Sequence, residues 1–116
     1  MYNWTPIQKE DIRWILCDFD DTIAKNTGYP DFIPTTPIDG ALQSLKKLDD
    51  MGYKIVIFTA RPWVDYQNIE NWCLEYGFPV RRIICGKPFG KCIVDDKNVA
   101  FNGDWKKALV DILYLE

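Results

Sequence analysis

Histidine is missing from the sequence, which excludes Ser-His-Asp and Cys-His catalysis and most zinc sites. The four cysteines form no CxxC pair, so we expect reduced, structural thiols. No apolar run approaches the roughly 20 residues that span a bilayer. The amino terminus lacks the basic and apolar regions of a signal peptide. We therefore expect one domain over residues 1–116, in the cytoplasm and without membrane contact.

An excess of basic residues is also lacking, since the formal net charge is −3. Double-stranded nucleic acid, which is bound chiefly through its phosphates, is therefore an unexpected partner. A small phosphorylated substrate stays compatible with this charge when a metal ion reverses the local field. The 47% of hydrophobic residues supply enough material for one core.

Apolar, β-branched runs alternate along the chain with segments of helical periodicity. This alternation predicts βαβ units, a largely parallel sheet and helices on both faces. The expected fold is a Rossmann-like three-layer α/β/α sandwich with strand order 3-2-1-4 and the first strand in the centre. The expected strands are 12–18, 53–59, 80–85 and 91–94, and the expected helices are 36–51, capped by Thr36, 62–76, and one that follows Asp104.

Acidic pairs follow two of these strands: Asp18 and Asp20 after the first, Asp95 and Asp96 after the fourth. A single aspartate at a strand end is most often a helix cap or a solvated turn. Two pairs at the carboxyl ends of neighbouring strands would repel one another unless a cation lay between them. An all-oxygen set of ligands suits Mg²⁺, which also binds substrate phosphate. The sequence thus predicts a magnesium site.

Two further side chains suggest phosphoryl chemistry at the same edge. Thr59 ends the second strand, where its hydroxyl could donate to a phosphoryl oxygen, and Lys87 precedes the fourth strand, where it could neutralise charge. Each would be ordinary alone. Of the two acids that follow the first strand, one carboxylate can attack phosphorus and the other can protonate the leaving group.

These residues together resemble the four motifs of the haloacid dehalogenase-like phosphohydrolases, in the same order and over about residues 12–105. The matching positions are Asp18-Phe19-Asp20-Asp21-Thr22, Thr59, Lys87 and Val94-Asp95-Asp96. The resemblance implies a Mg²⁺-dependent phosphatase that forms an aspartyl-phosphate.

Residue roles follow from the same resemblance. It implies that Asp18 is the nucleophile and Asp20 the general acid/base, and that Thr59 and Lys87 bind the phosphoryl group. It also implies that Mg²⁺ is held by Asp18, the Asp20 carbonyl and Asp96, with Asp95 as the partner of Asp96. The sequence leaves open which acid of that pair binds the metal directly.

The sequence departs from the family pattern at several points. Asp21 stands where many relatives have glycine, and the short interval before Asp95 makes Lys91 an alternative to Lys87. The intervals that hold cap domains in relatives are too short here, which indicates a capless member. We expect an open site with a small flap at 24–35; a macromolecular substrate or a second subunit of a homo-oligomer could also cover it.

The substrate is the least determined part of this interpretation. Arg61 and Trp63 follow the second strand and would suit a sugar phosphate, a nucleotide or another phosphorylated metabolite. Pairing of Arg61 with a surface acid and packing of Trp63 on the sheet are equally compatible with the sequence. A phospho-acceptor receiver-like signalling module and a catalytically idle interaction protein of the same fold are the alternatives.

Overall fold

The computed structural model describes residues 13–26 and 35–115. The flap expected at 24–35 lies largely outside these residues. The elements in chain order are β1 (Trp14–Cys17), α1 (Ala41–Asp50), β2 (Lys54–Phe58), the short 3-10 helix η1 (Trp63–Asp65), α2 (Tyr66–Tyr76), β3 (Val80–Ile84) and α3 (Trp105–Tyr114). None of the helices in the described ranges is long and apolar enough to cross a membrane.

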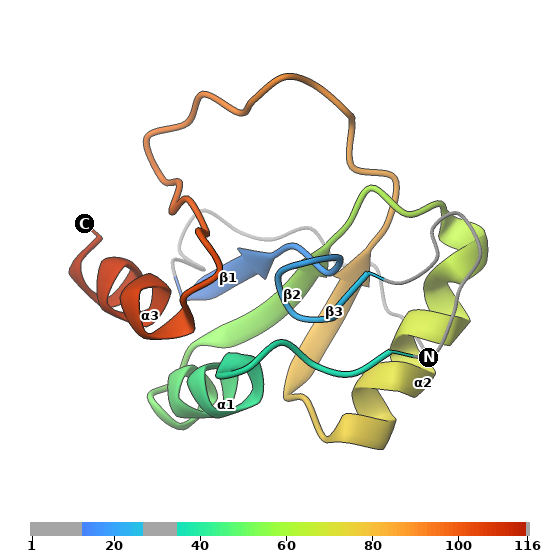
Figure 1. Ribbon diagram of the computed structural model, residues 1–116, viewed down its shortest axis with the longest axis horizontal. Coiled ribbons are helices and arrows are strands. Elements are labelled where there is room, and N and C mark those ends of the chain that lie inside the picture. Colours follow the sequence, from blue (N-terminus) through green and yellow to red (C-terminus); the bar gives the residue numbers. More distant parts are fainter. Residues whose placement is uncertain (1–12, 27–34, 116) are drawn as a thin grey trace.

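The three strands form one parallel sheet in the order β1-β2-β3, so the predicted α/β fold with a parallel sheet is confirmed (Figure 1). The central strand is β2, not β1 as the sequence suggested. Ile55, Val56 and Ile57 of β2 are 0% exposed, whereas Leu16 of β1 is 49% exposed. The reason is pairing: β2 has a neighbour on each side, and β1 has only one among the described residues.

Residues 91–94, where the sequence predicts a fourth strand, form no strand in this conformation, so the order 3-2-1-4 is not confirmed. Residues between β3 and α3 instead make a long loop that extends away from the sheet (Figure 1). Ile93 is 54% and Val94 95% exposed. A short strand gains stability only from pairing and from burying side chains, and the two glycines and the proline at 86–90 oppose a regular approach to the sheet.

The core lies on one face of the sheet. Side chains that alternate along β1 and β2, such as Cys17, Ile55 and Ile57, join one buried cluster with residues from every α-helix. The helical members are Ala41, Leu45, Leu48, Ile69, Trp72, Cys73, Trp105 and Ala108. The described residues therefore make two layers, and the three-layer sandwich is not observed in this part of the chain.

Helix α1 begins later than the sequence predicts. The expected cap, Thr36, instead accepts a hydrogen bond from the Lys25 amide through its main-chain carbonyl (3.0 Å), and the Ile38 amide donates to the Ile23 carbonyl (2.8 Å). These bonds hold the segment before α1 against the turn that follows β1. Gly40 has a left-handed backbone with φ of 85°, which is not helical, so α1 starts at the next residue, Ala41.

Candidate functional site

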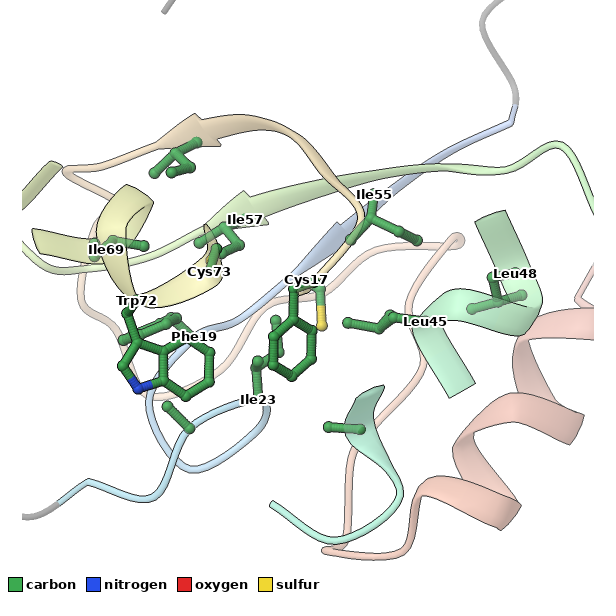
Figure 2. Packing of buried hydrophobic residues seen from close by; sticks show 14 of the residues in the cluster. Cys17, Phe19, Ile23, Leu45, Leu48, Ile55, Ile57, Ile69, Trp72 and Cys73 are labelled. Atoms are coloured by element: carbon green, nitrogen blue, oxygen red, sulfur yellow. The ribbon is translucent and has the colours of Figure 1, made fainter. Parts of the chain in front are cut away.

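A tight turn follows β1, and the buried Phe19 anchors it. Phe19 is 1% exposed, and its ring meets Trp72 edge-on with 5.1 Å between centroids (Figure 2). Its carbonyl accepts hydrogen bonds from the amides of Ile23 and Ala24, both at 3.0 Å. With Phe19 directed into the core, the aspartates on either side of it stay partly exposed at the carboxyl end of β1.

Asp21 takes a left-handed backbone conformation within this turn, with φ of 59°. Its amide donates to the Ala24 carbonyl at 2.7 Å, and its side-chain Oδ1 accepts from the Asn26 amide at 3.1 Å. Aspartate tolerates this conformation better than most residues because its short carboxylate can bond locally. Glycine adopts this conformation freely, and the local bonds of the Asp21 carboxylate allow aspartate to adopt it here.

Lys87 is the lysine that the structure brings to Asp18. Its Nζ lies 4.0 Å from Asp18 Oδ1 and 5.4 Å from the centre of the Phe58 ring. Its amide donates to the Thr59 carbonyl at 2.9 Å, which fixes the loop beside β2. Lys91, the alternative, lies exposed in the loop that leaves the sheet.

The environment of Asp18 raises the pKa of its carboxyl above the ordinary value. Burial is the largest cause, because it disfavours the charged form. The Lys87 ammonium and the Phe19 amide, which donates to Asp18 Oδ1 at 2.9 Å, oppose the shift, and the negative charges of Asp20 and Asp21 add to it. The site thus holds a carboxylate in a place that does not favour its charge.

A stability prediction follows from the raised pKa of Asp18. In the unfolded chain this carboxyl titrates near its ordinary 3.8, and in the folded protein it titrates higher. Folding therefore takes up protons between the two values, so the free energy of unfolding falls as pH rises through this interval. The isosteric Asp18→Asn should raise the melting temperature at pH 7.

Thermal unfolding of Asp18→Asn and wild type in a chelating, metal-free buffer measures this effect. The gap in melting temperature should widen from pH 4 to pH 7. A gap that stays constant, or a less stable variant at pH 7, would contradict the stated balance of burial over attraction to Lys87.

Thr59 follows β2 and is 1% exposed. Its amide donates to the Ile84 carbonyl at 2.9 Å. Its Oγ1 accepts a hydrogen bond from the Arg61 amide at 3.2 Å. A hydroxyl has one proton to donate, and accepting this bond leaves that proton for another oxygen. Thr59 therefore lies beside the Lys87 loop, as the sequence predicts, but it is covered in this conformation.

Arg61 pairs with Asp20 through two hydrogen bonds. Nε donates to Oδ2 at 2.7 Å and Nη2 to Oδ1 at 2.8 Å, so both carboxylate oxygens are engaged. Only 6% of the Arg61 side chain and 22% of the Asp20 side chain are exposed. This conformation shows Arg61 paired with an acid, but the partner is the partly buried Asp20 and not a surface acid as the sequence suggested. A substrate-binding role for Arg61 stays a prediction.

Trp63 lies at the surface near the Lys87 loop. It is 49% exposed and stacks on Tyr66 with 6.3 Å between ring centroids. Its Nε1 would come within 3.4 Å of a Cβ added to Gly86. It does not pack on the sheet as a buried residue, and it is placed where a planar substrate group bound next to Lys87 could meet it.

Asp95 and Asp96 lie apart from this cluster, in the exposed loop between β3 and α3. Asp95 Oδ1 accepts a hydrogen bond from the Lys97 amide at 2.9 Å, which is a local turn contact. Within residues 13–26 and 35–115, no group of three or more acidic, cysteine or histidine side chains is gathered as metal ligands. The oxygen ligands that the sequence predicts for Mg²⁺ come from two places in the chain. In this conformation Asp18 and Asp20 lie together after β1, whereas Asp95 and Asp96 lie in the exposed loop.

Asp65 is the residue that reasoning from sequence missed. It is 9% exposed, and its Oδ2 lies 3.6 Å from Arg61 Nη1. The signal was present as an arginine and an aspartate four residues apart, a spacing that usually describes an exposed helical pair. Nothing local indicates that both charges are buried.

Comparison with known proteins supports the fold. No family model matches the chain, and no curated protein matches it. Among solved structures, a protein from Vibrio cholerae is 21% identical, covering 86% of this chain and 98% of that one, with a TM-score of 0.63. A conserved protein from Bacteroides thetaiotaomicron is 23% identical over 86% of this chain and 88% of that one, also with a TM-score of 0.63. At these identities the likeness shows a shared fold.

Proposed function

We propose that this chain is a Mg²⁺-dependent phosphomonoester hydrolase that works through an aspartyl-phosphate on Asp18. The observation that carries the proposal is the group at the end of β1: a partly exposed Asp18 with Lys87 Nζ 4.0 Å away, and Asp20 two residues on with its carboxylate held in place. In this proposal Asp18 would be the nucleophile, Lys87 the cation for the transferred phosphoryl group and Asp20 the proton-transfer group.

The proposed reaction has two steps. Asp18 Oδ2 attacks phosphorus while the bond to the leaving alcohol breaks, and the departing oxygen takes a proton from the Asp20 carboxyl. Water then attacks the phosphorus of the aspartyl-phosphate and gives a proton to Asp20, which releases inorganic phosphate and restores Asp18. Lys87 stabilises charge on the phosphoryl oxygens, and the Thr59 hydroxyl would add to this in a conformation that uncovers it. Mg²⁺, when bound, would offset the repulsion between Asp18 and the anionic substrate.

We further propose a closed state in which residues 91–94 pair with β1, giving strand order 3-2-1-4. In that state Asp95 and Asp96 would lie near Asp18, and Mg²⁺ would be held by Asp18, the Asp20 carbonyl and Asp96. Two observations support it: β1 has one neighbour among the described residues, and Ile93 and Val94 are largely exposed. The third layer of the sandwich belongs to the same proposal.

Hydrolysis of p-nitrophenyl phosphate, with Mg²⁺ and with excess chelator, tests the activity itself. Turnover that requires Mg²⁺ is the expected result. No turnover of this or any member of a panel of phosphorylated metabolites would leave a receiver-like or idle module as the better interpretation. The panel also tests the proposed substrate class, which is a small sugar phosphate, a nucleotide or a related metabolite. We propose that the enzyme lacks a cap domain and works in the cytoplasm.

Cys92 provides a test of the closed state. It is exposed, whereas Cys17, Cys73 and Cys85 are buried, and burial raises the pKa of those thiols to about 12, about 12 and about 11. Because the thiolate is the reactive form, one thiol of four should react rapidly with a neutral alkylating reagent at pH 8.

Mass mapping should place this first alkylation on Cys92, and Cys92→Ser should remove it. Mg²⁺ together with a phosphate analogue such as beryllofluoride should slow the reaction, because pairing on β1 covers residues 91–94. An unchanged rate with saturating Mg²⁺ and analogue would argue against the closed state. Rapid alkylation of a buried thiol would instead contradict the described core.

A further inference from the structure

Burial of polar side chains is rare in this protein and is concentrated beside the proposed site. Among the described residues, the buried polar or charged side chains are Ser44, Thr59, Arg61 and Asp65. Three of these four fall within the seven residues that follow β2, and two of them are charged. A buried ion pair adds little net stability, because removing both charges from water costs about as much as their attraction returns. The arrangement therefore calls for another explanation.

The side chain of Arg61 lies between two carboxylates. Its Nε and Nη2 bond to both oxygens of Asp20, and its Nη1 lies 3.6 Å from Asp65 Oδ2. The guanidinium also lies over the ring of Phe19, 5.9 Å from the ring centre. The guanidinium is planar, and its two parallel hydrogen bonds fix the plane of the Asp20 carboxylate. A lysine ammonium could not do this, because it has no such fixed pair of donors.

The main chain of Arg61 reaches the other parts of the site. Its amide donates to Thr59 Oγ1 at 3.2 Å, and its carbonyl accepts from the Gly86 amide at 2.9 Å, directly before Lys87. One residue thus contacts the general acid, the phosphoryl-binding hydroxyl and the loop of the phosphoryl-binding lysine. Asp65, at the end of η1, lies beside the remaining arm of the guanidinium at an ion-pair distance of 3.6 Å, which is longer than a hydrogen bond.

We propose that Asp65 and Arg61 are positioning residues for proton transfer, with Asp65 orienting Arg61 and Arg61 orienting the carboxylate of Asp20 toward the leaving-group oxygen. The inference rests on the proposed function and deepens it. It differs from a role in binding substrate phosphate, because a phosphate ligand would have to displace Asp20 from a guanidinium that is already enclosed.

A leaving-group series separates the two roles. Phosphate monoesters with good leaving groups, such as p-nitrophenol, need little proton donation, whereas alkyl esters depend on it. The value of kcat/KM reports steps up to the first irreversible one, the transfer to Asp18. Asp65→Asn, which keeps the volume, should lower kcat/KM about tenfold for an alkyl phosphate and less than about twofold for p-nitrophenyl phosphate. Arg61→Lys should act in the same direction and more strongly.

Inhibition by inorganic phosphate supplies the second measurement. Its inhibition constant should stay within about twofold of wild type in Asp65→Asn, since the proposal leaves phosphate binding to Lys87 and Thr59. Ser44→Ala is the matched control, because Ser44 is buried and polar but belongs to α1. It should change neither the leaving-group dependence nor the inhibition constant. Circular dichroism establishes that each variant is folded.

The outcomes are distinct. An equal loss of kcat/KM for every leaving group, with weaker phosphate inhibition, would overturn the positioning role and assign Arg61 to phosphate binding. Unchanged kinetics in both folded variants would overturn it as well, with the phosphatase activity intact. A wild-type protein that hydrolyses no phosphate ester would remove the proposed function and this inference together. If Asp65→Asn does not fold, Arg61→Lys carries the same comparison.

Discussion

Asp18→Asn is expected to reduce phosphatase turnover by on the order of 10⁴-fold or more, because an amide oxygen cannot form the proposed aspartyl-phosphate. The fold should survive, since the substitution preserves shape and removes a charge from a place that disfavours it. Steady-state hydrolysis of p-nitrophenyl phosphate at saturating Mg²⁺ measures the loss. Acid quench and mass spectrometry of wild type during turnover should show one added phosphoryl group on the peptide that contains Asp18.

Asp18→Ala controls for slow deamidation, which would convert the introduced asparagine back to aspartate and restore a trace of activity. Asp20→Asn gives a second comparison: it should slow turnover by roughly 10²–10⁴-fold, the usual contribution of a proton-transfer group, and should still allow labelling of Asp18 with good leaving groups. Activity near wild type in either Asp18 variant would exclude the covalent mechanism.

Trp105→Ala is expected to lower the free energy of unfolding by about 3–5 kcal/mol, the usual cost of removing a buried tryptophan. Trp105 is 4% exposed, and its ring lies 5.2 Å from that of Phe101, centroid to centroid. A Cβ added at Gly40 would come within 3.1 Å of Trp105 Cβ, so the helix and the segment before α1 are closely packed. The indole Nε1 of Trp105 donates a hydrogen bond to the Thr22 carbonyl at 2.8 Å.

Urea unfolding followed by far-ultraviolet circular dichroism gives the free energy without relying on tryptophan fluorescence. Trp105→Phe should cost less, about 1–3 kcal/mol, since it keeps an aromatic ring and loses the bond to Thr22. Tyr114 lies on the same helix but is 81% exposed, so Tyr114→Ala should change the free energy of unfolding by less than about 0.5 kcal/mol. A loss below about 1 kcal/mol in Trp105→Ala would mean that α3 does not hold the turn after β1.

Local patterns predicted the elements whose stability is local. The strand expected at 53–59 contains β2, the helix expected at 62–76 ends at Tyr76, and Asp104 precedes α3 as its cap. Asp104 accepts hydrogen bonds from the amides of Lys106 and Lys107, as a capping aspartate should. The proximity of Lys87 to Asp18 was also predictable, because carboxyl ends of parallel strands meet at one edge.

Contacts between distant segments were not predictable in the same way. The apolar residues of 91–94 have the composition of a strand, but a strand requires a partner, and no local rule indicates whether that partner is reached. Thr36 and Pro37 indicate a helix start, yet hydrogen bonds to the turn after β1 decide their conformation. The pairing of Asp20 with Arg61 joins residues 41 positions apart, and sequence reasoning suggested only an unspecified surface acid as the partner of Arg61.

The edge of β1 has a consequence for handling the protein. Within residues 13–26 and 35–115, β1 pairs with β2 alone, and the free side of such a strand presents main-chain amides and carbonyls that can template pairing with another chain. This edge is blunted by its length of four residues and by the charges that flank it, Arg13 and Asp18. If residues 91–94 pair with the edge of β1 in the Mg²⁺-bound state, then removal of magnesium exposes both the unpaired edge of β1 and the apolar side chains of 91–94. Light scattering after prolonged dialysis against chelator should then increase, and restoring Mg²⁺ with phosphate beforehand should prevent it.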